Sequence, residues 1–153
     1  MMRRFNFEGD IYESLSCVPM AARRKLDRLA IKIGLEQWQK LSHGERLMIC
    51  HAPASSAEEC DALRLFINDV ALARSGAPPR QLHEQGRLSA DPPSAAPARL
   101  VANARTLGVG LTAREWELLD DDERYALIKL GGDEQPSHNL KAALLELLAS
   151  PKK

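Results

Sequence analysis

The residues best suited to chemistry are cysteines and histidines, and their spacing limits what they can do. They are Cys17, Cys50, Cys60, His43, His51, His83 and His138. A zinc site needs closely spaced pairs of ligands that recur along the chain, and these residues form none. We therefore predict no metal and no other cofactor, and we interpret each cysteine as a small buried hydrophobic residue. A metal-dependent protein or small enzyme built around the cysteines is an alternative.

Motifs for catalysis are also missing from the sequence. It contains no Gly-x-Ser-x-Gly nucleophile turn, no Gly-x-Gly-x-x-Gly pattern and no phosphate loop. The three consecutive carboxylates Asp120, Asp121 and Asp122 are explained more simply by the start of a helix, where the dipole favours negative charge. The sequence therefore predicts no catalytic residues and a protein that is not an enzyme.

The composition excludes two classes of function. The chain has 153 residues, with 21 Lys plus Arg against 21 Asp plus Glu, which argues against a generic binder of polyanions. Only 5% of residues are aromatic, too few for a platform that stacks single-stranded bases. Residues 1–8 lack the apolar stretch of a secretory signal, and nothing approaches the roughly 20 apolar residues of a membrane span. An odd number of cysteines without a Cys-x-x-Cys pair favours a soluble, cytoplasmic protein.

Proline marks a division in the middle of the chain. Five of the nine prolines fall between Gly76 and Ala98, in a stretch without a sustained apolar period. We interpret about 75–97 as a linker on the surface, between a first repeat at about 16–74 and a second at about 98–149. We expect all of 1–153 to pack as a single helical domain.

The two flanking parts resemble each other when the sequence is shifted by 78 positions. The matched pairs are Pro19/Pro97, Leu29/Leu107, Trp38/Trp116, Leu41/Leu119, Glu45/Glu123 and Arg46/Arg124. We therefore predict an internal duplication with Trp38, Arg46, Trp116 and Arg124 as its anchors. Each Trp is best interpreted as a large core residue of its copy, with a binding hot spot as the alternative. Each Arg is either a surface residue or a donor to buried carbonyls.

Start and stop signals predict an all-α fold. Prolines 19 and 97 suit the first turn of a helix, the first helix running to about Ile31. Capping signals at Ser42, Ser56, Thr112 and Asp120 each have Glu three residues later. Gly131-Gly132 is expected to end a helix, and a last one is expected to begin near Ser137. Residues 31–33 and 109–111 alternate briefly, which predicts a tiny strand pair between the two copies.

Two charged segments are candidate binding surfaces. Arg23, Arg24 and Arg28 make one helix locally basic, and short helices joined at a glycine suggest a helix-turn-helix DNA-binding regulator as an alternative function. The acidic segment Asp120, Asp121, Asp122 and Glu123 in the second copy would repel phosphate. We therefore favour a protein partner for both segments over nucleic acid, and the oligomeric state stays open.

Several segments together carry a family resemblance. They are Phe5-Asn6-Phe7-Glu8, Cys17-Val18-Pro19-Met20, Arg23, Lys25-Leu26-Asp27, 34–38, Gly108-Val109, Thr112, Trp116 and 124–130. With these segments the chain resembles the nitrate reductase-associated protein family. The resemblance covers roughly residues 5–149 and is weakest at 75–98 and 131–137.

The resemblance implies a function but no active site. The family is named after genes that lie near nitrate reductase in cyanobacteria and other bacteria, and it is thought to help produce active assimilatory nitrate reductase, a molybdenum and iron–sulfur enzyme. It implies a non-catalytic accessory protein whose partner is nitrate reductase or an assembly intermediate of it.

Overall fold

The computed structural model describes residues 2–82 and 90–149, and most of them are helical. The predicted all-α fold is therefore confirmed. The chain divides into two compact units, residues 1–90 and 91–153. The boundary lies inside the proline-rich segment that was expected to be a linker. That both units form a single domain stays a prediction.

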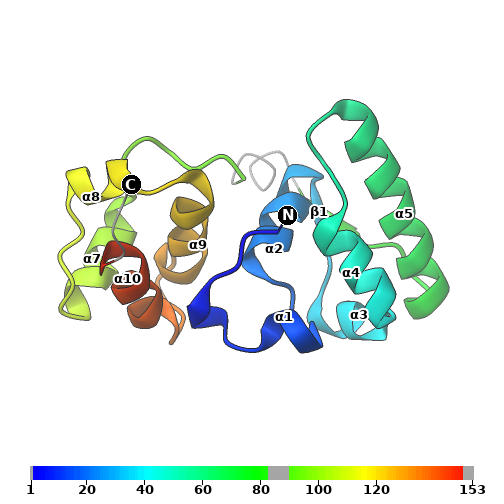
Figure 1. Ribbon diagram of the computed structural model, residues 1–153, viewed down its shortest axis with the longest axis horizontal. Helices are drawn as coiled ribbons and strands as arrows, with labels where there is room; N and C mark the ends of the chain where they lie inside the picture. The colour runs from blue at the N-terminus through cyan, green and yellow to red at the C-terminus, as the bar shows by residue number, and fades with distance from the viewer. Residues whose placement is uncertain (1, 83–89, 150–153) are drawn as a thin grey trace. The chain divides into compact units, whose positions relative to one another are not determined.

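The helices of the first unit, which Figure 1 shows side by side, pack around one apolar core. Its elements are the 3-10 helix η1 (Asn6–Glu8), α1 (Ile11–Ser14), α2 (Met20–Arg28), β1 (Ile31–Lys32), α3 (Leu35–Lys40), α4 (His43–His51), α5 (Ala57–Ser75) and β2 (Arg80–Gln81). Helix α2 packs against α4, and α5 packs against α3 and α4. Trp38 and Ile49, both fully buried, lie in the core with Leu26 and Leu63.

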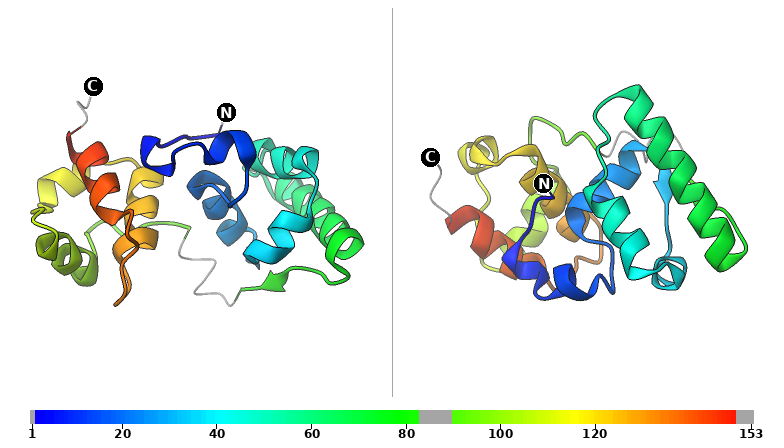
Figure 2. Two further views of the ribbon diagram at one scale, coloured as in Figure 1. Left: turned by 90° about the horizontal axis from the view of Figure 1, so that it is seen from below. Right: turned by 45° about the vertical axis from the view of Figure 1, so that its right-hand side comes forward.

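The described part of the second unit, residues 91–149, contains four helices. They are α7 (Ala98–Thr106), α8 (Ala113–Leu118), α9 (Asp121–Gly131) and α10 (Leu140–Ala149) (Figure 2). Helices α7, α9 and α10 pack on one another, and α10 buries Leu140, Leu144 and Leu147 as expected from its spacing. Gly131 makes this packing possible, because a Cβ there would lie 2.7 Å from the Leu140 side chain and 2.8 Å from that of Leu100.

All four predicted capping signals form complete capping boxes. In each, the side chain of the N-cap residue accepts from the third backbone N–H, and the Glu side chain accepts from the N-cap N–H. The N-cap residues are Ser42, Ser56, Thr112 and Asp120. Helices α4, α5, α8 and α9 therefore begin where the sequence indicates.

The end of α2 and the strand pair differ from expectation. Helix α2 ends at Arg28, three residues earlier than predicted, because Ala30 takes a left-handed conformation with φ 60° that a helix cannot continue through. The strand that follows pairs antiparallel with residues 80–81, Ile31 opposite Gln81, and not with residues 109–111. The N–H of Leu82 then donates to the oxygen of Ala30 at 2.8 Å. The tiny strand pair is therefore confirmed, but the expected second strand at 109–111 is wrong, and residues 80–81 take its place.

The segment expected to be a linker is partly ordered into the first unit. Helix α5 ends at Ser75 with Gly76 as a left-handed cap, and β2 follows four residues later. Ala90 is buried, and its oxygen accepts from Nε of Arg24 at 2.8 Å. Residues 83–89, which include His83, lie outside the described residues.

Three helices of each unit correspond at the predicted offset of 78 residues. Helices α2 and α3 coincide in both bounds with α7 and α8, and α4 begins where α9 does. Inside these helices the buried residues change size in opposite directions, from Ala22 to Leu100 and from Leu26 to Ala104. This correspondence is what a duplication would produce, and the duplication itself stays a prediction.

Candidate functional site

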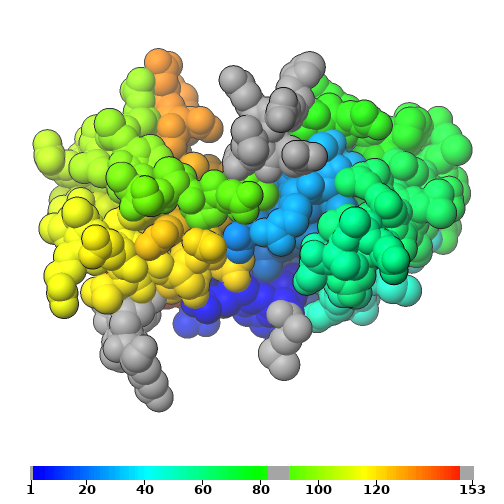
Figure 3. Space-filling view, turned by 90° about the horizontal axis from the view of Figure 1, so that it is seen from above, coloured from blue at the N-terminus to red at the C-terminus, as the bar shows by residue number. Residues whose placement is uncertain are grey.

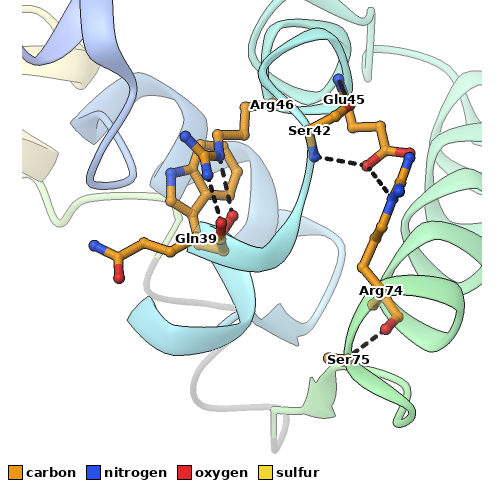
Figure 4. Close-up of polar contacts among 8 residues, drawn as sticks. Gln39, Ser42, Glu45, Arg46, Arg74 and Ser75 are labelled. Atoms are coloured by element: carbon orange, nitrogen blue, oxygen red, sulfur yellow. Dashed lines mark hydrogen bonds and ion pairs between the residues drawn. The ribbon is translucent and has the colours of Figure 1, made fainter.

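The Trp and Arg anchors of the first unit join α3, α4 and the segment before α2. The indole of Trp38 is fully buried, and its Nε1 donates to the oxygen of Leu15 at 2.7 Å. Arg46 on α4 donates from Nε to the oxygen of Trp38 at 3.1 Å and from Nη2 to that of Gln39 at 2.6 Å. Figure 4 shows Arg46 directed at the backbone of Gln39. The guanidinium thus donates to two carbonyls at the end of α3, one of which, that of Trp38, also accepts from the N–H of Leu41 at 3.1 Å.

The second unit repeats these hydrogen bonds at the same offset. Trp116 donates from Nε1 to the oxygen of Pro93 at 3.2 Å. Arg124 donates from Nε to the oxygen of Trp116 at 3.0 Å and from Nη2 to that of Glu117 at 3.2 Å. Its guanidinium also lies 5.7 Å from the centre of the Trp116 ring. Of the two alternatives for each Arg, the carbonyl donor is the one the geometry shows.

A carboxylate from the N-terminal segment completes the start of α2. The N-cap residue Pro19 has no side-chain acceptor, and Oε2 of Glu8 accepts from the N–H of Met20 at 3.0 Å instead. Tyr12 donates to Oε1 of Glu8, while its own oxygen accepts from the N–H of Phe5 at 2.7 Å. Burial, together with the hydrogen bond to Glu8, raises the pKa of Tyr12. Sequence analysis missed this cluster, although it contains residues of two of the segments that carry the family resemblance, residues 5–8 and 17–20.

Lys25 turns inward from the basic helix and holds the end of α4. Its Nζ donates to the oxygens of Ile49, Cys50 and Ala52 at 3.0, 2.9 and 2.6 Å. Burial lowers the pKa of Lys25 and raises that of the Cys50 thiol to about 11. At the corresponding position of the second unit, Asn103 donates to two carbonyls beside the end of α9. Lys25 and Asn103 align at the offset of 78 residues, and this alignment is the sequence signal that could have identified their shared role.

The basic residues expected to bind a partner separate into two groups on α2. Arg23 and Arg28 are exposed, whereas Arg24 is half-buried and hydrogen-bonded to Ala90. A charged side chain that already holds the backbone of its own unit is poorly placed to contact another molecule. The exposed cations of this helix are therefore Arg23 and Arg28.

The acidic segment also divides. Asp120 and Glu123 form the capping box of α9, with Glu123 only 2% exposed. Asp121 is exposed and lies 3.9 Å from Nη1 of Arg124, and Asp122 is half-exposed. Two of the four predicted partner-binding carboxylates thus stabilise their own helix, and Asp121 and Asp122 present charge at the surface.

The cysteines lie in different environments. Cys50 is buried, and the half-buried Cys60 donates from Sγ to the oxygen of Ala54 at 3.4 Å. Cys17 is exposed, so the interpretation of each cysteine as a buried residue is wrong for Cys17. Among residues 2–82 and 90–149, no group of three or more His, Cys, Asp or Glu side chains is arranged to hold a metal ion. Within the same ranges, every helix is too short or too polar to cross a membrane.

Fold and contacts define a mostly helical protein whose two units carry the same Trp–Arg arrangement. A family model described as conserved nitrate reductase-associated protein matches residues 4–147. The chain therefore belongs to the nitrate reductase-associated protein family, as the resemblance indicated. Comparison with curated proteins and with solved structures gives no significant match.

Proposed function

We propose that the protein is a non-catalytic accessory protein, which binds nitrate reductase or an assembly intermediate of it and assists its maturation or stability. The observation that carries the proposal is the family match over nearly the whole chain. We assign it to the cytoplasm, where assimilatory nitrate reductase is expected to work. The proposed contacts are the exposed charges Arg23 and Arg28 on α2 and Asp121 on α9, together with the half-exposed Asp122.

Copurification from cells grown on nitrate tests the proposal. The tagged protein is expected to retain nitrate reductase, and deletion of its gene is expected to lower the activity of the reductase. No retention, together with unchanged nitrate reduction in the deletion strain, would contradict the proposal.

Charge reversal tests the assigned surface separately. Replacing Arg23 and Arg28 together by Glu is expected to reduce retention about tenfold, because exposed charges at an interface steer association. The matched control replaces Arg105 and Arg114, two exposed arginines of α7 and α8, by Glu. Equal retention by both double variants would remove α2 from the proposed interface.

A further inference from the structure

The longest helix has an exposed apolar surface opposite the side that packs into the core. Helix α5 buries Leu63, Ile67 and Ala71, yet Leu65 is 63% exposed and Leu72 is 55% exposed. Residues seven positions apart lie on the same side of a helix, so the two leucines form one stripe. Figure 3 shows the green segment that contains α5 at the surface of the first unit.

Three carboxylates share this side of the helix. Glu58, Asp61 and Asp69 are all exposed, and with the leucines they follow the spacing of a single helix side. We define the outward face of α5 as Glu58, Asp61, Leu65, Asp69 and Leu72. It is both apolar and negatively charged.

The two basic residues of α5 itself, Arg64 and Arg74, are already paired within the unit. Nε of Arg74 lies 3.1 Å from Oε1 of Glu45 on α4, and Nη1 of Arg64 lies 2.8 Å from Oδ1 of Asp61. The Arg64 side chain also turns away, donating from Nε to the oxygen of Leu29 at 3.3 Å. Glu58 and Asp69 therefore keep the outward face acidic.

This charge distribution indicates which occupant suits the face. Two copies of α5 packed antiparallel, with Leu65 opposite Leu72, would bring the two Asp69 side chains together, and like charges in contact oppose association. A helix with leucine-like residues seven positions apart and flanking Lys or Arg would bury both leucines and complement the carboxylates.

We propose that the outward face of α5 binds a cationic amphipathic helix of a partner protein. The apolar residues of that helix pack on Leu65 and Leu72, and its basic side chains pair with Glu58 and Asp69. This face is separate from the surface proposed to bind nitrate reductase, because none of the charged residues proposed for that contact lies on α5. The partner helix is defined here by its chemistry alone.

Fluorescence anisotropy with a designed peptide tests the proposal. The probe is a labelled peptide of about 20 residues, the length of α5, with leucine at heptad positions and lysine on both flanks. A peptide of the same composition in scrambled order is the reference. The patterned peptide is expected to bind the full chain at least about tenfold more tightly than the scrambled one, and more weakly as salt increases.

Leucine variants map the binding to α5. Leu65→Gln with Leu72→Gln is expected to weaken binding at least about tenfold, since buried apolar anchors dominate such interfaces. The matched control is Leu118→Gln with Leu145→Gln, which removes two leucines of similar exposure, 51% and 55%, from the second unit. Asp69→Lys is expected to weaken binding and to reduce its salt dependence.

Three outcomes would overturn the proposal. They are equal affinity for the patterned and scrambled peptides, equal losses in the two leucine double variants, and a dimer in sedimentation that Leu65→Gln with Leu72→Gln abolishes. The last result would assign the face to a second copy of the chain. Copurification of nitrate reductase is a separate readout, so each proposal can fail alone.

Discussion

The two units begin alike and end differently. In both, an Arg on the third matching helix donates to carbonyls at the end of the Trp helix, with bonds at equivalent positions. The last helix, however, packs against α3 and α4 in the first unit and against α7 and α9 in the second. Gly131 allows the second arrangement, because its missing side chain leaves room for Leu140 and Leu100. The corresponding residue of the first unit is Pro53, just beyond α4, where the chain turns away toward α5.

The two units therefore share a framework of matching helices and differ in the helix that packs against it. The framework includes hydrogen bonds from Arg46 and Arg124 to carbonyls at the ends of α3 and α8. The last helix is positioned by apolar packing, which tolerates other arrangements when volumes match. Among residues 2–82 and 90–149, the long helix with an exposed acidic and apolar face is α5 of the first unit.

Removing either indole is expected to have the largest effect. Trp38→Ala and Trp116→Ala should each lower the free energy of unfolding by about 3–5 kcal/mol, the range for large buried aromatic residues. Urea unfolding followed by circular dichroism measures the loss. Since the chain has two Trp residues, one in each unit, the fluorescence of the remaining one reports the other unit. A loss below about 1 kcal/mol for either variant would contradict its place in the core.

Local features of this fold were readable in the sequence, and contacts between distant residues were not. The capping box at Ser42 is encoded by a Glu three residues away, so its helix was placed correctly. The strand partner of Ile31 is Gln81, 50 residues further on, and two-residue strands carry no pattern that identifies a partner.

The candidate site was predictable in part for the same reason. The Trp and Arg positions emerged from the comparison of the two halves, yet only the structure shows the carbonyls that they bind. Lys25 looked like one more cation of a basic helix, because its inward direction depends on the position of α4. Glu123 looked like surface charge, although its carboxylate closes the capping box of its own helix.

Removing the donor at the end of α4 is expected to lower the free energy of unfolding more than removing the donor at the end of α9. Lys25→Met keeps the apolar stem but leaves three carbonyls without the ammonium, at an expected cost of about 2–3 kcal/mol. Asn103→Ala removes two bonds and should cost about 1–2 kcal/mol. Urea unfolding compares both with Arg23→Met, an exposed position on α2 that should change little. A larger loss for Asn103→Ala than for Lys25→Met would contradict this order.

Alkaline pH should affect the first unit through Cys50. Burial raises the pKa of its thiol from 9.0 to about 11, so between these values the unfolded chain releases a proton that the folded chain retains. Stability is therefore lost as pH rises from 9 to 11, by about 2 kcal/mol from this group. The lowered pKa of Lys25 acts in the opposite direction as pH rises toward 10.5, so the effect of Cys50 is isolated by difference.

The measurement compares the pH profiles of the unfolding free energy for the wild type and Cys50→Ala. The wild type is expected to lose about 2 kcal/mol more than the variant between pH 9 and 11. Parallel profiles would show that the thiol titrates alike in the folded and unfolded chains. The corresponding position of the second unit is Ile128, which does not titrate, so this sensitivity belongs to the first unit.

The smallest expected effects come from a left-handed backbone position that is alanine in the first unit and glycine in the second. Ala30 has φ 60° and Gly108, its counterpart, has φ 82°, a region that favours glycine. Ala30→Gly should therefore stabilise the protein by about 0.5 kcal/mol, and Gly108→Ala should destabilise it by about 1 kcal/mol. No atom lies within 4 Å of a Cβ added at Gly108, so backbone strain alone would produce the second effect.

Two matched controls distinguish this strain from ordinary effects of glycine. Ala73→Gly in the exposed interior of α5 should destabilise by about 1 kcal/mol, and Gly110→Ala, where φ is not positive and the space is open, should be close to neutral. Urea midpoints measured side by side give the signs. If Ala30→Gly destabilised as much as Ala73→Gly, the left-handed turn after α2 would not be shared by the two units, and the correspondence between them would end at Leu29.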